Sequence, residues 1–121
     1  MSKQTYCTTF NKQIRAFFAQ IKQVYPDLKE IKAVAAQLNM ALAMDETVAV
    51  VNFHKHLVAK YEAQIMKQDE AFFLAFDLTG TPLSDLNHLK SVYANASDNT
   101  KECIWKYTKV LTLLSKKFAS C

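Results

Sequence analysis

The sequence predicts an all-α protein, a single-domain bundle of five or six mostly antiparallel helices. Three observations indicate this fold class. The 121 residues include one Gly and two Pro, the residues that loops use most, so long helices and few loops are expected. Half of the residues are hydrophobic, which is enough for one buried core. Apolar residues also recur at helical spacing along most of the chain.

The N-terminal third should form a short tail and two helices. We expect a tail over residues 1–8, followed by a helical domain over residues 9–121. The first helix should cover residues 9–25, because a wide apolar face follows that stretch and Pro26 disfavours helical geometry in the residue before it. Pro26 can open a second helix, whose apolar pattern stops at Asp45.

The middle of the chain predicts a third helix over Glu46–Lys67, capped by Asp45. The segment Asp69–Phe76 either starts a new helix or continues the third helix with a kink, and its three Phe predict burial on all sides. A loop follows at Asp77–Pro82, which contains the single Gly. Ser84 can then cap a short helix.

The last helix should begin at a capping box formed by Asn99 and Glu102. Its apolar stripe consists of Ile104, Tyr107, Leu111, Leu114 and Phe118. At about 100° per residue, Trp105 points away from this stripe. It lies instead among Lys101, Lys109 and Lys116.

The sequence leaves three interpretations of Trp105 open. The ring can stack on nucleic-acid bases while the amines of Lys101, Lys109 and Lys116 contact phosphates. It can be the centre of a protein interface, where Trp is a frequent hot spot. It can also be covered by the first helix or by the N-terminal tail. These four residues are our candidate interaction site.

The net charge of +4 is unevenly distributed along the chain. Residues 1–25 carry four basic residues and no acidic one, and residues 98–121 carry five Lys against two acidic residues. The remaining residues carry six Lys against nine acidic residues. Basic ends around an acidic middle fit contact with nucleic acid or an acidic protein surface, and they also fit ordinary solvated helix faces.

The cysteines and the N-terminus indicate a reducing compartment. Cys7, Cys103 and Cys121 are odd in number and lack CxxC spacing, which argues against a disulfide framework. The first residues do not resemble a signal peptide, and no stretch of 18 apolar residues is present, so we expect no membrane span.

No motif for catalysis, cofactor binding or metal binding stands out. His54 and His56 are two residues apart, so a helix directs them to opposite sides and they cannot share one ion. The adjacent carboxylates of Asp69 and Glu70 diverge in the same way and suit a helix start. We therefore expect no enzyme activity, no cofactor, no metal and no small-molecule substrate.

Three strings in the C-terminal half resemble a small, all-helical family of nucleocytoplasmic large DNA viruses. They are Asp69-Glu70-x-Phe72-Phe73, Leu89-Lys90-x-x-Tyr93, and Thr100-Lys101-x-x-Ile104-Trp105-Lys106-Tyr107-x-x-x-Leu111. The chain departs from the pattern at Tyr93, where Trp is expected, and at Thr108, where Leu is expected. The resemblance implies no reaction and no catalytic residue.

The resemblance and the residues together lead to one functional expectation and one alternative. The resemblance implies a structural or interaction protein of a large DNA virus, such as a minor capsid or internal virion component, located in the host cytoplasm and in the virion. Such a protein should bind a protein partner or itself. The alternative is a nucleic-acid-binding protein in genome packaging or late transcription that uses the basic N- and C-terminal helices.

Overall fold

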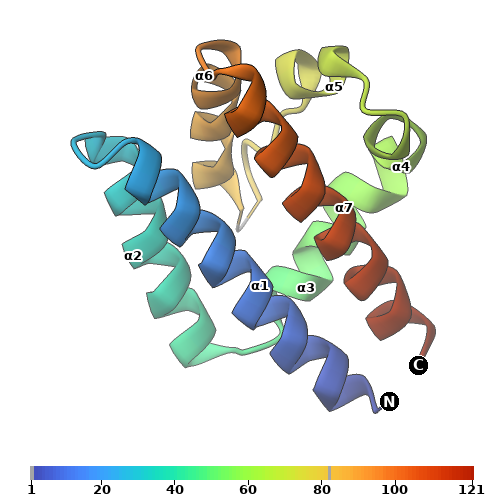
Figure 1. Ribbon diagram of the computed structural model, residues 1–121. Helices are drawn as coiled ribbons and strands as arrows, with labels where there is room; N and C mark the ends of the chain where they lie inside the picture. Colours follow the sequence, from blue (N-terminus) through green and yellow to red (C-terminus); the bar gives the residue numbers. More distant parts are fainter. Residues whose placement is uncertain (1, 82) are drawn as a thin grey trace.

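The computed structural model describes residues 2–81 and 83–121, which form helices and no strand (Figure 1). Their order is α1 (Lys3–Val24), α2 (Lys29–Met44), α3 (Val48–Phe53), the π-helix η1 (His54–Val58), α4 (Ala59–Met66), α5 (Glu70–Ala75), the 3-10 helix η2 (Ser84–His88), α6 (Leu89–Ala94) and α7 (Asp98–Ser120). Because α3, η1 and α4 are continuous and η2 runs into α6, the described chain has six helical segments. The predicted all-α class is confirmed.

The two longest helices, α1 and α7, lie side by side and run in opposite directions (Figure 1). The Lys3 amine lies 4.7 Å from the centre of the Phe118 ring, and the rings of Phe17 and Tyr107 are 5.3 Å apart. The start of α1 therefore meets the end of α7, and both termini lie at one end of the bundle. α2 packs against α1, while α3, η1 and α4 pack against α7.

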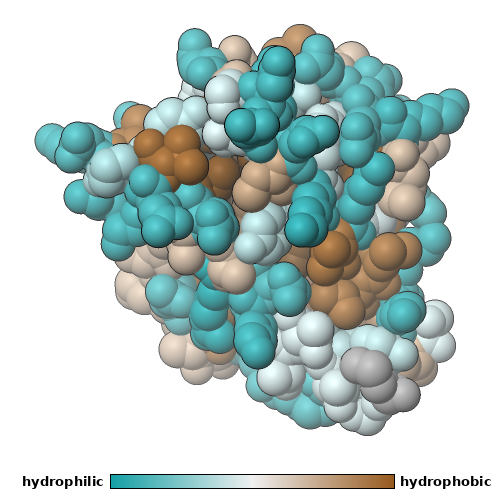
Figure 2. All heavy atoms as spheres, viewed as in Figure 1, coloured by the Kyte–Doolittle hydropathy of each residue, from teal (hydrophilic) through white to brown (hydrophobic). Residues whose placement is uncertain are grey.

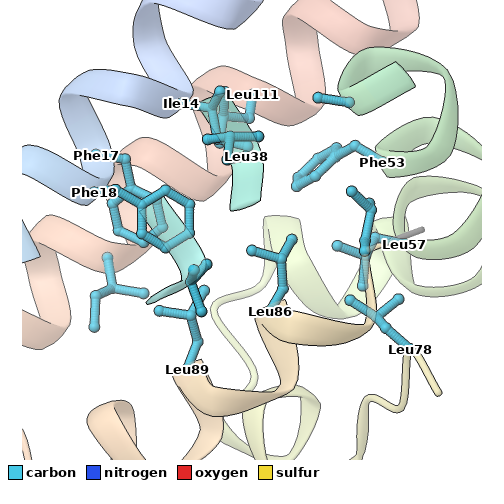
Figure 3. Close-up of a cluster of buried hydrophobic side chains, with 14 of the residues drawn as sticks. Ile14, Phe17, Phe18, Leu38, Phe53, Leu57, Leu78, Leu86, Leu89 and Leu111 are labelled. Atoms are coloured by element: carbon cyan, nitrogen blue, oxygen red, sulfur yellow. The ribbon is translucent and has the colours of Figure 1, made fainter. Parts of the chain in front are cut away.

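The core forms where α1, α2, α3, η2 and α7 converge (Figure 3). Its side chains include Ile14, Phe17, Phe18, Leu38, Phe53, Leu86 and Leu111. A cavity of about 30 Å³ remains among these apolar groups, with Thr108 as its one polar lining residue. This volume is of the order of one or two water molecules, which is too small for an organic ligand.

The N-terminus differs from the predicted tail over residues 1–8, because α1 already begins at Lys3. The Ser2 side chain accepts a hydrogen bond from the backbone N–H of Thr5, which caps the helix. Cys7 is buried, and its thiol donates to the Glu46 carbonyl at 3.2 Å. A capped start and a buried residue in the second turn hold this segment in the helix.

The segment predicted as a third helix runs from Val48 to Met66 but contains the π turn η1 and a kink at Tyr61, whose φ of −129° and ψ of 15° are not helical. Val50, Phe53 and Leu57 are buried in one α-helical register, whereas Val58 and Ile65 are buried in a register shifted by one residue. A π turn inserts one extra residue and so joins the two registers. Val51, next to the buried Val50, lies outside this face, and its side chain is 43% exposed.

The start of α5 decides a prediction that the sequence left open, and the start of α7 contradicts another prediction. The segment after Lys67 is a separate helix, α5, because Gln68 has a φ of 55° and the Asp69 carboxylate accepts from the Ala71 N–H at 3.0 Å. The predicted capping box at Asn99 is wrong. Ser97 caps α7 instead, accepting from the Thr100 N–H at 3.3 Å.

Within the described residues, no individual helix has both the length and the apolar character needed to cross a bilayer. The pair Lys29–Met44 and Val48–Met66 meets these criteria only when the two helices are taken together, and it is bent by 114°.

Candidate functional site

Trp105 is buried, with 5% of its surface exposed. Its ring packs edge-on against Phe73, with ring centres 4.8 Å apart, and tilted against Phe72 at 6.3 Å. Its indole N–H donates to the Tyr93 hydroxyl at 3.1 Å. The expectation of an exposed Trp105 that stacks on bases or anchors a partner is therefore wrong. The ring is covered, as the third interpretation held, but by α5 and α6 instead of the first helix or the N-terminus.

The buried face of α7 is wider than its apolar stripe, which explains the position of Trp105. Thr108, Thr112 and Ser115 are buried on the same side of the helix as the indole. Thr108 donates its hydroxyl to the Ile104 carbonyl at 2.7 Å, and Thr112 and Ser115 bond to carbonyls of α7 in the same way. A hydroxyl satisfied within its own helix can be buried at little cost.

A chain of polar contacts leads from the indole to the surface. The Tyr93 hydroxyl accepts from Trp105 and donates to the Glu70 carboxylate at 2.9 Å. The Lys101 amine lies 3.4 Å from the same carboxylate oxygen and 5.0 Å from the centre of the Tyr93 ring. The hydrogen bond from Tyr93, aided by the charge of Lys101, lowers the pKa of Glu70. Burial, aided by the nearby carboxylate, raises the pKa of Tyr93.

These contacts join the three strings that resemble the viral family. α5 contributes the Phe-rich string, α6 contributes Tyr93, and α7 contributes Lys101 and Trp105. We name this group the Trp105 cluster; it consists of Phe72, Phe73, Tyr93 and Trp105, with Glu70 and Lys101 at its rim. The rings of Phe73 and Tyr93 stack with centres 4.4 Å apart. The cluster therefore attaches α5 and α6 to α7, and its residues act in packing.

The three lysines predicted beside Trp105 do not form one free basic patch. Lys101 is held by Glu70, and the Lys116 amine lies 2.6 Å from the Glu62 carboxylate on α4. Lys109 is half-exposed and borders a shallow surface hollow. Two of the three candidate amines therefore pair with carboxylates, Lys101 with one on α5 and Lys116 with one on α4.

The geometry of the Trp105 cluster fits a structural role better than a role in acid–base catalysis. A phenol with a raised pKa stays protonated, so Tyr93 acts as a hydrogen-bond donor and not as a base.

His54 and His56 lie on η1 and are both half-buried. No group of three His, Cys, Asp or Glu side chains that could hold a metal occurs within residues 2–81 and 83–121.

The three cysteines lie in different environments. Cys7 is buried, Cys103 is half-buried and Cys121 is exposed. Burial, aided by the charge of Glu46, raises the pKa of the Cys7 thiol and keeps it protonated. A protonated thiol is a poor nucleophile. Cys7 instead helps Asn11 to hold the Glu46 carbonyl, since both side chains donate to it.

The outward side of α2 is mostly apolar, with the exposed Gln37 and Asn39 at its two edges. At 100° per residue, one face of this helix carries Ala33, Ala36, Met40, Ala43 and Met44, and all five are exposed. We name it the α2 outer face. Met40 is 64% exposed and Met44 is 89% exposed. No charged residue occurs between Lys32 and Asp45. In Figure 2, pale brown atoms lie along the lower left, where Figure 1 places α2.

The structure also brings the two basic ends of the sequence together. α1 carries Lys3, Lys12, Arg15 and Lys22 and no acidic residue. α7 beside it carries five Lys against Asp98 and Glu102. We name this pair of helices the α1/α7 basic layer. Hydrophilic side chains cover much of this side of the molecule (Figure 2).

Comparisons of the chain with protein-family models, with curated proteins and with solved structures each found no match. The resemblance carried by the C-terminal strings therefore stays a prediction. The candidate site rests on the geometry of the Trp105 cluster and of the two surfaces.

Proposed function

We propose that this chain is a structural or interaction protein that acts through helix-face contacts and catalyses no reaction. The observation that carries this proposal is the α2 outer face. Soluble proteins seldom leave a contiguous apolar face uncovered unless it binds something. The two Met side chains on it are flexible and adapt readily to a binding surface. Within the described chain, no other helix covers them.

The viral setting is a further part of the proposal and rests on the resemblance of the C-terminal half. In this setting the chain is a minor capsid or internal virion component of a large DNA virus, made in the host cytoplasm and carried in the virion. The Trp105 cluster supports the comparison in one respect. The strings on which the resemblance rests meet in space and have a shared structural role in this chain.

The test of the proposal compares Met40→Lys with Leu74→Lys in the cells that produce the protein. Both side chains are apolar and similarly exposed, at 64% and 67%, but Leu74 lies on α5. The native protein should migrate as an assembly larger than one chain. Met40→Lys should release the monomer, because it places a charge in the middle of the α2 outer face, and Leu74→Lys should leave the assembly intact.

Two results would contradict the proposal. One is a native protein that migrates as a monomer in those cells, and the other is an assembly that Met40→Lys leaves unchanged. The viral setting has a separate test, which is to look for the chain in purified virions and in infected-cell extracts. We expect it in the virions, and its confinement to the extracts would contradict a virion role.

A second candidate function, nucleic-acid binding, is favoured by the α1/α7 basic layer. The sequence separates its two basic ends, but the antiparallel packing of α1 and α7 places them on adjacent helices. If several of these amines contact phosphates, affinity for duplex DNA should fall steeply with salt, with a slope of about −0.9 per phosphate on logarithmic axes. The variant Lys12→Glu/Lys106→Glu should weaken binding, and no binding at low salt would exclude this candidate.

A further inference from the structure

We propose that the α2 outer face binds the same face of a second copy of this chain, with the two α2 helices antiparallel. This inference rests on the proposed interaction function and names its partner. Two properties of the face favour a second copy over an unrelated protein: the sizes of its side chains and the charges at its ends. When two copies of the face are related by a twofold axis, large side chains meet small ones and positive ends meet negative ends.

Side-chain size sets the register of the pair. A twofold axis that crosses the outer face at the level of residue 38 along the helix places Ala36 of each copy opposite Met40 of the other, and Ala33 opposite Ala43. Each Met thioether then lies over an Ala methyl group, and the Ala pairs let the helix axes approach to about 8 Å. A closed twofold interface of this kind uses the same surface on both copies, as most homodimers do.

Charge selects the antiparallel orientation. The exposed Lys29 and Lys32 lie at the N-terminal end of α2, and the exposed Asp45 and Glu46 follow its C-terminal end. Antiparallel pairing places the lysines of each copy near the carboxylates of the other, whereas parallel pairing places like charges together. Glu30 lies about 100° round the helix from Lys29, at the edge of the face. The helix dipoles also oppose each other favourably in the antiparallel pair.

The dimensions of the face predict a weak pair. The 16 residues of α2 span about 24 Å, and a helix face is about 10 Å wide. A standard stable interface buries about 800 Å² on each partner, so this contact is at the small end. We expect monomer and dimer to exchange, with a dissociation constant in the micromolar range.

Sedimentation of the purified full chain at low salt tests this inference. The average mass should rise from one chain towards two as the concentration increases from about 1 to about 300 µM. Met40→Lys should weaken the dimer at least tenfold, because it introduces two positive charges into the apolar contact close to the twofold axis. Leu74→Lys, matched in exposure but on α5, should not weaken it.

A charge-exchange experiment tests the antiparallel register. Lys32→Glu and Glu46→Lys should each weaken the dimer, since each juxtaposes like charges at both ends of the contact. An equimolar mixture of the two variants should form a heterodimer several-fold tighter than either variant alone. In that heterodimer one end has exchanged charges and the other end is native, so both ends are complementary.

The inference is overturned if the chain stays monomeric at about 300 µM. It is also overturned if Leu74→Lys weakens the dimer as much as Met40→Lys, or if the mixture is no tighter than its components. These outcomes differ from a failure of the proposed function. A monomeric chain whose cellular assembly is still lost in Met40→Lys retains the function and uses the face for another protein. A monomeric chain whose cellular assembly is insensitive to Met40→Lys loses both.

Discussion

Replacing Trp105 by Ala should remove a large part of the stability of the protein. The indole is 5% exposed, contacts the rings of Phe72 and Phe73, and donates the hydrogen bond that Tyr93 accepts. Truncation of a buried Trp to Ala costs about 3–5 kcal/mol. This loss is a large fraction of the unfolding free energy of a domain of this size, which is about 5–15 kcal/mol. It should lower the melting temperature by roughly 10–20 °C.

Trp105→Phe serves as the matched control, because it keeps most of the packing and removes the indole N–H. It should cost less, about 1–2 kcal/mol, since the Tyr93 hydroxyl loses a donor but keeps its own bond to Glu70. Urea unfolding followed by circular dichroism measures both variants. The single Trp also gives a direct readout in the native protein, whose emission should be blue-shifted and resistant to aqueous quenchers.

Two results would refute the reasoning on Trp105. One is a loss of less than about 1 kcal/mol in Trp105→Ala, because surface substitutions have effects of that size. The other is a red-shifted emission that aqueous quenchers reach easily, which would place the indole at the surface.

Three further predictions concern the polar groups that hold the helices. The pKa of Glu70 is lowered in the folded state, so its contribution to stability is present above its ordinary value of 4.5 and is lost as pH falls through the folded value. The difference in unfolding free energy between wild type and Glu70→Gln should therefore shrink from about pH 6 to about pH 3. Ser97→Ala should cost about 1 kcal/mol in urea unfolding, and Asn99→Ala less than half as much. Thr112→Val should change stability by less than about 1 kcal/mol, because its hydroxyl bonds only within α7.

The sequence predicts most helices because their causes are local. Apolar spacing, Pro26 and the turn at Asp45 place the end of α1, the bounds of α2 and the start of the third helical segment within a few residues, whereas α1 begins at Lys3, well before the predicted start at residue 9. The Asp69 carboxylate caps α5 as an acidic residue at a helix start should. What local pattern cannot show is the π turn at His54–Val58, because an extra residue in a helix is fixed by which side chains the rest of the fold buries.

The position of Trp105 could not be predicted from the sequence for a related reason. The apolar stripe of α7 leaves out Thr108, Thr112 and Ser115, because these residue types are classed as polar. Each of them is nevertheless buried, with its hydroxyl bonded to its own helix. The stripe therefore appears narrower than the face that the fold covers. The Phe-rich segment after Asp69 was the available signal, because three aromatic rings in five residues need a partner surface. That surface is the side of α7 that carries Trp105.

The α2 outer face could not be predicted from the sequence either, because α2 has the ordinary pattern of an amphipathic helix. Its buried side supplies Ile31, Val34, Leu38 and Leu42, as an amphipathic helix should. The opposite side contains Ala and Met where most surface helices carry charges. The sequence shows the 12 uncharged residues between Lys32 and Asp45, but only the packing shows which of them stay exposed.

Methionine oxidation tests the central claim, that the α2 outer face is the contact surface, most directly. In the dilute chain, peroxide should oxidise Met44 and Met40 faster than Met66, whose exposures are 89%, 64% and 43%. In the assembly, Met40 and Met44 should react more slowly while Met66 on α4 keeps its rate. Protection of Met66 alone, or equal rates in the dilute and assembled states for all three, would contradict the claim.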